Sequence, residues 1–443
     1  MNYYRKFLLF VALFVVCFTS VATMVPNNAK AASDPLGINA GAAILLDAKT
    51  GKVLYQKNPD AVLGVASMSK MMTEYMVLEA IHDKKISWDQ KVMINEYVHK
   101  LSAAPGLSNV GLTQGEEYTV KELYQAMAIF SGNAATVALA ETVAGTEKNF
   151  VALMNKKAKE LGLNDYNFVN SSGLNNESLL GNIPAGGPKD ENVMSARAVA
   201  KLAFHLINEY PEVIETASTP KLNFKKDGRE YPNFNWMLPG LIFEYKGVDG
   251  LKTGSTDFAG YCFTATAERN GQRFISVVMK ADSKDSRFTE TRKVLDYAFN
   301  NFAEEEVLPK HYQVKGTKTL PVVKGKGDKV KIYTKDAINL VLKNGEKENY
   351  KAVLVLDKKK LTEDGELTAP VKKGDKIGYV TIESKTDDDL GFLYGKGDKT
   401  IKVDVIAAEN VEKANGFVLM MRGIGGFFGD VWGSVSSAVA GWF

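Results

Sequence analysis

The sequence of 443 residues predicts an α/β protein whose mixed helical and strand patterns give way near residue 303 to a small all-β region and then to an amphipathic helix. Apolar residues follow helical spacing at residues 120–129 and 198–207. Beyond residue 303, short alternating runs separated by polar turns cover residues 330–333, 352–356, 377–382 and 400–406. With 45% hydrophobic residues, the chain can build two domains.

The first expected element is a secretory signal peptide at residues 1–31. Two basic residues precede a short apolar run at residues 7–18, and small residues at Ala29 and Ala31 mark a cleavage site. The mature chain is expected to begin near Ala32. The alternative is an uncleaved anchor helix, which the shortness of the apolar run disfavours.

Residues 32–303 are predicted to form a catalytic domain, because they carry three short motifs in one order. These are Ser-x-x-Lys at residues 67–70, Ser-x-Asn at residues 131–133 and Lys-Thr-Gly at residues 252–254. Together they describe a serine nucleophile that uses a lysine, rather than a histidine, as its proton carrier.

Local context separates these motifs from second copies of the first and third patterns. Ser67 opens a helical run without breakers, which puts it on one helix face with Lys70. The second Ser-x-x-Lys contains Pro220, which argues against a helix there. The second Lys-Thr-Gly, at residues 49–51, reads as an exposed hairpin turn, whereas Lys252 leads into a strand-like run that can hold it beside a cleft.

Each motif supplies a group that acyl transfer requires. Lys70 can accept the Ser67 proton if burial and a neighbouring charge, such as that of Lys252, lower its pKa. Ser131 can relay a proton to the leaving amine, and the Asn133 amide can bind substrate backbone or fix Lys70. A helix N-terminus at Ser67 would direct backbone N–H groups at an oxyanion.

The ordered set resembles the penicillin-recognising serine enzymes, which include class A β-lactamases and penicillin-binding proteins. The segments at residues 168–174, 248–251 and 286–288 narrow the resemblance to the low-molecular-mass D-alanyl-D-alanine carboxypeptidases of the penicillin-binding protein 5 type. The resemblance covers residues 36–302 and implies a β-lactamase/DD-peptidase-like sandwich, with helices on both sides of an antiparallel sheet.

This resemblance implies that Ser67 is the acylated nucleophile and Lys70 its base. It also implies that Ser131 relays the proton and that Asn133 contacts the substrate. No metal or cofactor is expected, because the four histidines show no metal-ligand spacing. Cys262 would be the one thiol left after signal cleavage, and its apolar strand indicates a packed core residue.

On the substrate side, the resemblance implies a carboxylate site at Lys252 and Thr253. Gly254 belongs to the same motif, and the backbone N–H of Ser255 would complete the oxyanion hole together with that of the nucleophile. Arg287 is a further candidate for binding the carboxylate. The alternative for Arg287 is a surface ion pair.

The expected substrate is a peptidoglycan stem pentapeptide that ends in D-Ala-D-Ala, because its free carboxylate lies beside the scissile amide. Its last D-alanine would leave through an acyl-serine intermediate, as a step in cell wall maturation. β-Lactam antibiotics should acylate Ser67 and inhibit, since the chain has no convincing Glu-x-x-Leu-Asn element to speed their release. A β-lactamase and a non-catalytic wall-binding protein are the alternatives.

Residues 304–409 are predicted to form a β-rich domain without a catalytic constellation, which favours a role as spacer or protein-interaction module. Its many lysines are most simply a solvated face. A net charge of +3 gives no reason to expect nucleic-acid binding.

Residues 410–443 are predicted to form an amphipathic helix that lies in a membrane interface, because charges nearly vanish after residue 417 while apolar residues keep helical spacing. Three alternatives are a helix packed on the protein itself, a true membrane span and a disordered tail. With the signal peptide, this places the enzyme on the outer face of the cytoplasmic membrane, on the cell wall side.

Overall fold

The structure is a computed structural model, and the chain forms two units, residues 1–37 and residues 38–443. In the first unit, the described residues make a turn in which the Leu36 amide donates to the Asp34 side chain at 3.1 Å. The signal peptide expectation lies outside the described residues. The structure describes residues 34–224, 226–386, 389–394, 401–417 and 419–420.

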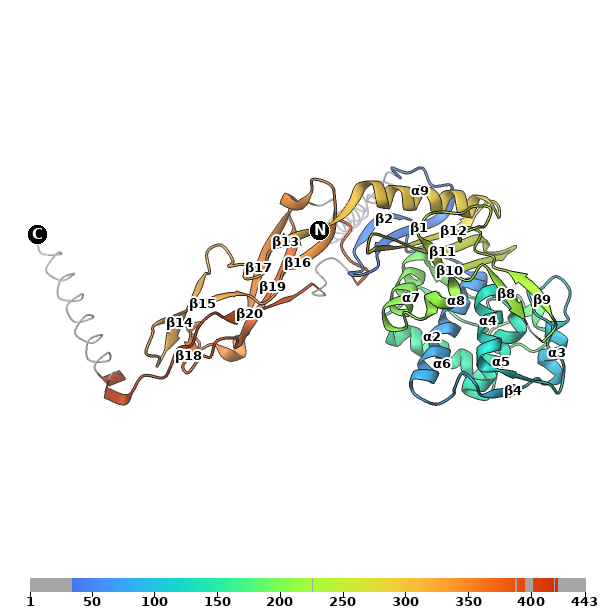
Figure 1. The fold of residues 1–443 in the computed structure, drawn as a ribbon, viewed down its shortest axis with the longest axis horizontal. Helices are drawn as coiled ribbons and strands as arrows, with labels where there is room; N and C mark the ends of the chain where they lie inside the picture. The colour runs from blue at the N-terminus through green and yellow to red at the C-terminus, as the bar shows by residue number, and fades with distance from the viewer. Residues whose placement is uncertain (1–33, 225, 387–388, 395–400, 418, 421–443) are drawn as a thin grey trace, which may run out of the picture. The chain divides into compact units, whose positions relative to one another are not determined.

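The part of the chain that carries the three sequence motifs is called the catalytic region below. A five-stranded antiparallel sheet in the order β10-β11-β12-β1-β2 forms its centre. Helix α9 (Ser286–Asn301) lies along one face and α7 (Ala196–Glu209) along the other (Figure 1). Burial on both faces explains the long apolar runs of these strands. The expected sandwich of helices around an antiparallel sheet is therefore confirmed. The strands are β1 (Ala40–Asp47), β2 (Val53–Lys57), β10 (Val248–Thr256), β11 (Gly260–Arg269) and β12 (Gln272–Ala281).

A cluster of helices builds the other side of the catalytic region around α2 (Lys70–His82). Its neighbours bury ten of its thirteen residues, and the polar Lys70, Thr73 and Glu74 are among the buried ones. Helix α4 begins with a capping box, in which Thr119 and Glu122 satisfy each other's backbone N–H groups. The other helices here are η1 (Ala66–Ser69), α3 (Glu96–Ser102), α4 (Val120–Phe130), α5 (Asn133–Ala144), α6 (Glu147–Glu160), η2 (Asn176–Leu179) and α8 (Val213–Ala217).

Three small antiparallel sheets complete the catalytic region, and two of its turns hold the second motif copies. Residues 49–51 form the turn between β1 and β2, as expected. Ser218 caps the end of α8 and Lys221 starts a strand, so they share no helix face. The small sheets pair β3 (Val62–Gly64) with β7 (Val193–Ser195) and β6 (Tyr166–Asn167), β4 (Lys91–Met93) with β5 (Glu117–Thr119), and β8 (Lys221–Phe224) with β9 (Arg229–Pro232).

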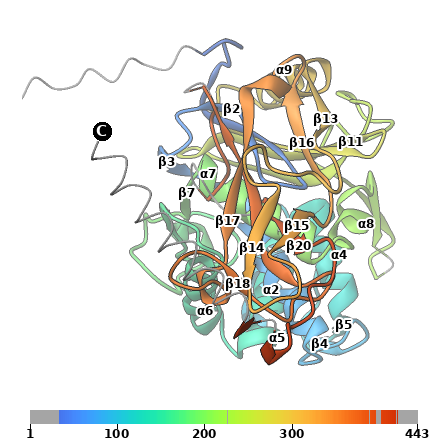
Figure 2. The same cartoon turned by 90° about the vertical axis from the view of Figure 1, so that its left-hand side faces the viewer.

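The β region has its own apolar core and two sheets, one of two strands (β13-β16) and one in the order β17-β19-β20-β15-β14-β18 (Figure 2). Leu342 and Val330 are fully buried in this core. The all-β expectation is confirmed. The elements are β13 (Phe302–Leu308), β14 (Thr319–Val323), β15 (Lys329–Thr334), β16 (Ile338–Lys343), η3 (Lys347–Asn349), β17 (Tyr350–Leu356), η4 (Lys358–Lys360), β18 (Leu367–Thr368), β19 (Lys376–Ser384) and β20 (Val403–Ala407).

The predicted C-terminal helix lies mostly outside the described residues. Residues 416–417 and 419–420 are helical, and the Phe417 and Met420 side chains are exposed. Val411 and Ala414, by contrast, are buried, so the packed β region extends to residue 414. In the part of the chain that the structure describes, no helix is both long enough and apolar enough to cross a bilayer.

Candidate active site

Ser67 lies in the short helix η1, one residue after a strained backbone position. Ala66 has a positive φ of 46°, which is unfavourable for a residue with a Cβ. The strained turn is held from outside by Gly173, whose own φ is +79°. A Cβ on Gly173 would fall 1.8 Å from the Ala66 carbonyl oxygen, so only glycine fits there. The nucleophile is thus fixed by a close backbone contact rather than by the helix alone.

The Lys70 amine makes three polar contacts that fix its chemistry. Its Nζ lies 2.9 Å from Ser67 Oγ, 2.7 Å from Asn133 Oδ1 and 2.7 Å from the Ser172 carbonyl oxygen. The amide and carbonyl oxygens can only accept hydrogen bonds, so a neutral amine donates both its protons to them. Its lone pair then faces the Ser67 hydroxyl, which is the geometry of a general base.

The environment of Lys70 favours that neutral form. Its side chain is completely buried. Burial, followed by the positive charge of Lys252, lowers the Lys70 pKa well below its usual value of 10.5. This is the shift that a lysine needs in order to act as the base.

Asn133 is the first residue of α5, and its side chain is held at both ends. Its Nδ2 donates to the Ser108 carbonyl at 3.0 Å, which leaves Oδ1 directed at the Lys70 amine. Of the two roles considered for Asn133, fixing Lys70 is the one that this geometry displays. Ser131, two residues earlier, ends α4 in the left-handed conformation, with φ of 59°. Its Oγ is buried and has no hydrogen-bond partner among the described residues.

The Ser172 carbonyl that accepts a hydrogen bond from Lys70 belongs to a buried loop, and hydrogen bonds from side chains fix the position of this loop. Asn170 accepts from the Gly173 amide at 2.7 Å, and Thr73 donates to the Ser171 carbonyl at 2.8 Å. The Ser171 hydroxyl donates to Glu147 at 2.6 Å. The loop therefore places a backbone acceptor, and residue 172 itself contributes no side-chain group to Lys70.

The Lys-Thr-Gly motif lies on β10, which is the edge strand of the main sheet. Gly254 runs close to the nucleophile, since a Cβ there would lie 3.0 Å from the Ser67 nitrogen. Lys252 is buried beneath the strand, and burial lowers its pKa to about 8. Among the described residues, its Nζ makes one polar contact, which is a long one of 3.4 Å to the Thr253 carbonyl.

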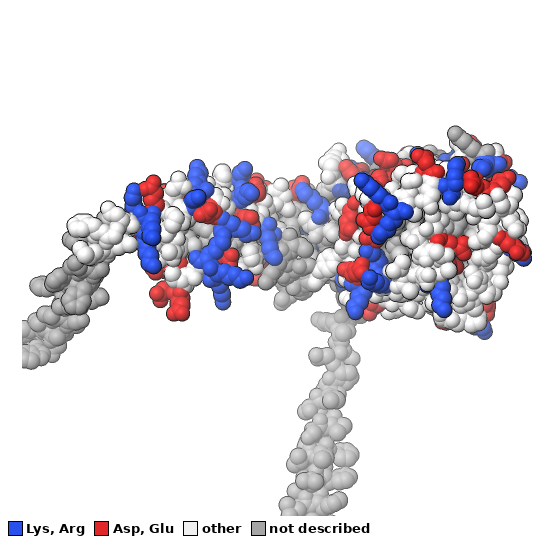
Figure 3. Space-filling view, turned by 90° about the horizontal axis from the view of Figure 1, so that it is seen from below, with Lys and Arg blue, Asp and Glu red and all other residues white. Residues whose placement is uncertain are grey.

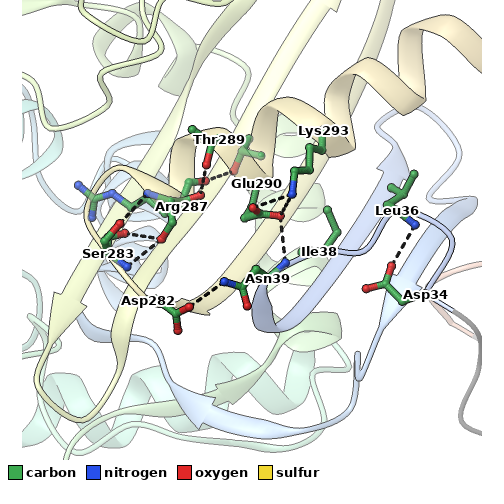
Figure 4. A network of polar contacts seen from close by, with 12 residues as sticks. Asp34, Leu36, Ile38, Asn39, Asp282, Ser283, Arg287, Thr289, Glu290 and Lys293 are labelled. Atoms are coloured by element: carbon green, nitrogen blue, oxygen red, sulfur yellow. Dashed lines mark hydrogen bonds and ion pairs between the residues drawn. The ribbon is translucent and has the colours of Figure 1, made fainter.

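Arg287, near the start of α9, is buried rather than paired on the surface. Its side chain is 3% exposed, and its Nη1 lies 3.5 Å from the Gly254 carbonyl. Figure 4 shows its guanidinium apart from the contacts that Glu290 makes with Lys293. Burial lowers the Arg287 pKa to about 10. The surface ion pair considered for Arg287 is therefore wrong.

These groups converge on one cleft with a volume of about 610 Å³. The cleft is polar, and Lys70 and Lys252 lie behind its wall rather than in it. Among the described residues, no cluster of three or more histidine, cysteine or acidic side chains is placed to hold a metal ion. The predicted residues that line the cleft are Ser67, Ser131, Asn133, Thr253, Gly254, Ser255 and Arg287.

Two features of the site escaped sequence reasoning. One is the Ser172 carbonyl, which no residue type could indicate. The other is Glu74, a buried acid one helical turn beyond Lys70, whose charge acts on both active-site lysines. An acid inside an otherwise apolar run, four residues after the candidate base, was a signal that could have found it.

Comparison with the models of known protein families gives two matches, one for each region of the chain. The family model described as D-alanyl-D-alanine carboxypeptidase matches residues 28–283, and that of the penicillin-binding protein 5 C-terminal domain matches residues 302–413. This chain belongs to the D-alanyl-D-alanine carboxypeptidase family. Members of this family are serine hydrolases that act in peptidoglycan maturation, and they are penicillin-binding proteins.

Several relatives are similar to this carboxypeptidase over both the catalytic region and the β region. D-alanyl-D-alanine carboxypeptidase DacF of Bacillus subtilis is 34% identical over 387 residues, which are 87% of this chain and 89% of DacF. DacC of Escherichia coli is 32% identical over 92% of this chain and 90% of its own length. The solved penicillin-binding protein 5 of Haemophilus influenzae is 30% identical, with a TM-score of 0.66 over 85% of this chain and 98% of its own.

A structure limited to one region is also similar. Penicillin-Binding Protein D2 of Listeria monocytogenes, solved in its ampicillin-bound form, is 34% identical with a TM-score of 0.51. It matches over 99% of its own length but 60% of this carboxypeptidase.

Proposed function

We propose that this carboxypeptidase removes the terminal D-alanine of peptidoglycan stem peptides with Ser67 as nucleophile and Lys70 as base. The observation that carries the assignment is the Lys70 amine, which is buried, has two pure acceptors and lies 2.9 Å from Ser67 Oγ. Burial favours the neutral form of a lysine in such a setting, and in that form its lone pair is directed at the hydroxyl.

In acylation, Ser67 Oγ bonds to the carbonyl carbon of the penultimate D-alanine while its proton passes to Lys70. Negative charge develops on the carbonyl oxygen, and the backbone N–H groups of Ser67 and Ser255 are the candidate donors to it. The C–N bond then breaks, and the proton passes from Lys70 through the Ser131 hydroxyl to the leaving amine of D-alanine. The ester on Ser67 remains.

In deacylation, a water molecule replaces the departed amine. Lys70 accepts its proton as the hydroxyl attacks the ester, and the proton returns to Ser67 Oγ when the ester bond breaks. The products are the shortened peptide and the free enzyme. The same lysine therefore serves both half-reactions without a change in the net number of bound protons.

The substrate's terminal carboxylate requires cations near the cleft. Thr253 and Arg287 line it, and Lys252 lies directly behind Thr253. A buried cation without a carboxylate partner gains most from an incoming anion, because the partner removes the cost of its burial. The edge position of β10 also leaves backbone groups free to pair with an extended peptide.

β-Lactams are expected to acylate Ser67 by the same route. The related Penicillin-Binding Protein D2 was solved in ampicillin-bound and cefotaxime-bound forms, which supports this extension. Slow hydrolysis of the resulting ester would make these compounds inhibitors.

We also propose that the chain is exported by residues 1–31 and held on the outer face of the cytoplasmic membrane by residues 416–443, the part of the predicted 410–443 anchor that lies beyond the buried Val411 and Ala414. Support comes from the signal-like N-terminus and from the apolar, charge-poor C-terminus. Truncation after Asn415 keeps the buried Val411 and Ala414 and should release active enzyme into the soluble fraction. Continued sedimentation with membranes would count against this anchor.

The decisive experiment measures D-alanine release from a D-Ala-D-Ala pentapeptide. The wild type should release D-alanine, whereas Ser67→Ala and penicillin-treated wild type should not, with at least about a thousandfold loss of rate. Ser87→Ala, at an exposed serine outside the cleft, is the matched control and should keep full activity. Multiple turnovers of penicillin would instead identify a β-lactamase, and no reaction with either compound would identify a binding protein.

A further inference from the structure

Glu191 is a largely buried acid that lines the cleft and has no role in the proposed mechanism. It is 8% exposed and lies two residues before β7. Its Oε2 accepts a hydrogen bond from Thr256 Oγ1 at 2.6 Å, and its Oε1 lies 3.3 Å from Asn175 Nδ2. Thr256 is the last residue of β10, and Asn175 directly precedes η2. Glu191 is therefore held between two segments that both line the cleft.

These contacts leave Glu191 without a positive partner. Both of its hydrogen-bond partners in the described part of the chain are neutral. The two oxygens of a carboxylate can accept more hydrogen bonds than these two. A buried carboxylate in this state gains most from a cationic donor, because such a donor offsets the cost of its burial. Glu191 is thus prepared to bind a positively charged group that enters the cleft.

The charged groups of the cleft are separated along β10. Arg287 Nη1 lies 3.5 Å from the carbonyl of Gly254, the last residue of the Lys-Thr-Gly motif. Glu191 is bonded to Thr256, two residues further along the strand, and Asp257 lines the cleft directly after it. A ligand with a carboxylate at its end and an amine further back along its chain matches this order of charges.

The proposed reaction sets the direction of the peptide along β10. The terminal carboxylate is assigned to Thr253, and the scissile carbonyl to the backbone N–H of Ser255. The peptide therefore runs antiparallel to β10, and the residues before the scissile bond continue towards Thr256 and Asp257. An extended chain advances about 3.3 Å per residue, so the residue before D-Ala-D-Ala reaches the end of β10, beside the acids.

A neighbouring cavity of about 490 Å³ is the other space open to the side chain of that residue. It shares residues 255–257 with the cleft and is lined further by Lys280 and Asp282. Asp282 already accepts a hydrogen bond from the Asn39 side chain at 2.7 Å, as Figure 4 shows. Lys280 is a cation and repels an amine. The side of the cleft that holds Glu191 is therefore the better site for positive charge.

We propose that Glu191, assisted by Asp257, binds a side-chain amine on the residue that precedes D-Ala-D-Ala, so that the enzyme selects stem peptides with a cationic residue at this position. The proposal rests on the function proposed above, because that function sets the direction of the peptide. An ammonium group on a carboxylate forms a charge-assisted hydrogen bond, which is about twice as strong as a neutral one. Glu191 thereby contacts the part of the substrate that remains on Ser67 after D-alanine has left.

The test compares two pentapeptides that differ in one group. Both are acetylated at the N-terminus and end in D-Ala-D-Ala, and the preceding residue is L-lysine in one and Nε-acetyl-L-lysine in the other. The wild type should show a kcat/KM about tenfold higher for the lysine peptide, mainly through a lower KM. Glu191→Gln keeps the shape of the side chain and should lose this preference, because kcat/KM falls for the lysine peptide alone.

Two further variants show where the preference arises. Glu117→Gln is the matched control, since Glu117 is exposed on β5 and lies outside the lining of the cleft, and it should keep the wild-type preference. Asp257→Asn should lower the preference by about twofold, because water screens an exposed charge. A larger loss with Asp257→Asn than with Glu191→Gln, or any loss with Glu117→Gln, would contradict the proposal.

Three other results would overturn it. They are an equal kcat/KM for the two peptides in the wild type, a preference that survives in Glu191→Gln, and an equal loss for both peptides in Glu191→Gln, which indicates a structural role. The first result requires no variant, so it decides the question even if Glu191→Gln does not fold. Failure of the proposed function is distinct: the wild type would release D-alanine from neither peptide, or Ser67→Ala would still release it.

Discussion

The catalytic region and the β region bury very different side chains. At the cleft and behind it, the catalytic region places Lys70, Lys252, Arg287 and Glu74 almost entirely out of contact with water. Among the described residues of the β region, Thr334 is the one buried polar side chain. Its lysines and acids lie intermixed on the surface, as Figure 3 shows. Buried charges are costly, so their concentration in one region marks where the chain gives up stability for chemistry.

This difference separates the residues that act in catalysis from the residues that only stabilise the fold. In the catalytic region, substitutions should change activity because each buried polar group has few substitutes. In the β region, substitutions should change stability alone, and surface changes should have little effect at all. The following predictions test that separation, from the largest expected effect on activity to the smallest.

Gly173→Ala should be the most damaging. The new Cβ would lie 1.8 Å from the Ala66 carbonyl, so the turn that carries Ser67 must move. Penicillin acylation should slow by at least about a hundredfold, since small displacements of a catalytic group have effects of this size. Gly181→Ala is the matched control, because Gly181 also has a positive φ, +85°, but faces open space. Equal acylation rates for the two variants would contradict this account of the turn.

Raising the pH should weaken substrate binding next most strongly. The Lys252 pKa is about 8, so its ammonium form is lost as the pH rises through that value. Between pH 7 and pH 9 the protonated fraction falls about tenfold, and KM for the D-Ala-D-Ala peptide should rise by a similar factor. Steady-state kinetics across this range provide the measurement. A flat KM would mean that Lys252 does not bind the carboxylate.

Leu342→Ala should leave activity intact and destabilise the β region. Leu342 is fully buried in that region's core, where loss of such a side chain costs about 2–5 kcal/mol. Differential scanning calorimetry should show a lower unfolding temperature for part of the chain, while the penicillin acylation rate stays at the wild-type value. Reduced acylation would show that the two regions are coupled.

Lys351→Ala should have the smallest effect. Lys351 pairs with Glu383 at 3.3 Å, but both side chains are about half exposed. Exposed ion pairs contribute under about 1 kcal/mol, so the change in unfolding free energy should be close to the error of a denaturant titration. A loss comparable to that of Leu342→Ala would overturn the view that this surface is only a solvated face.

The catalytic motifs could be predicted because their chemistry depends on local spacing. Ser67 and Lys70 meet whenever their segment is helical, and Lys252 required only a strand. Glu74 and the Ser172 carbonyl could not be found in this way. One acts through space on two lysines, and the other is a backbone atom that any residue would supply.

The β region shows a similar division between local and distant interactions. Alternating runs predicted strands that the structure places at β15, β17 and β19. The order of those strands was not predictable, because β14 pairs in parallel with the distant β18 and β15 pairs with β20. Such pairings depend on packing over many residues, which a local pattern does not contain.

The unpartnered Ser131 hydroxyl has a consequence for inhibitor design. Ser131 lines the cleft, and its hydroxyl can both donate and accept a hydrogen bond. A compound that places a matching group on this oxygen gains a directional contact worth about 0.5–1.5 kcal/mol, in addition to its own contacts. Non-covalent ligands can therefore be anchored at the proposed proton relay without any reactive group.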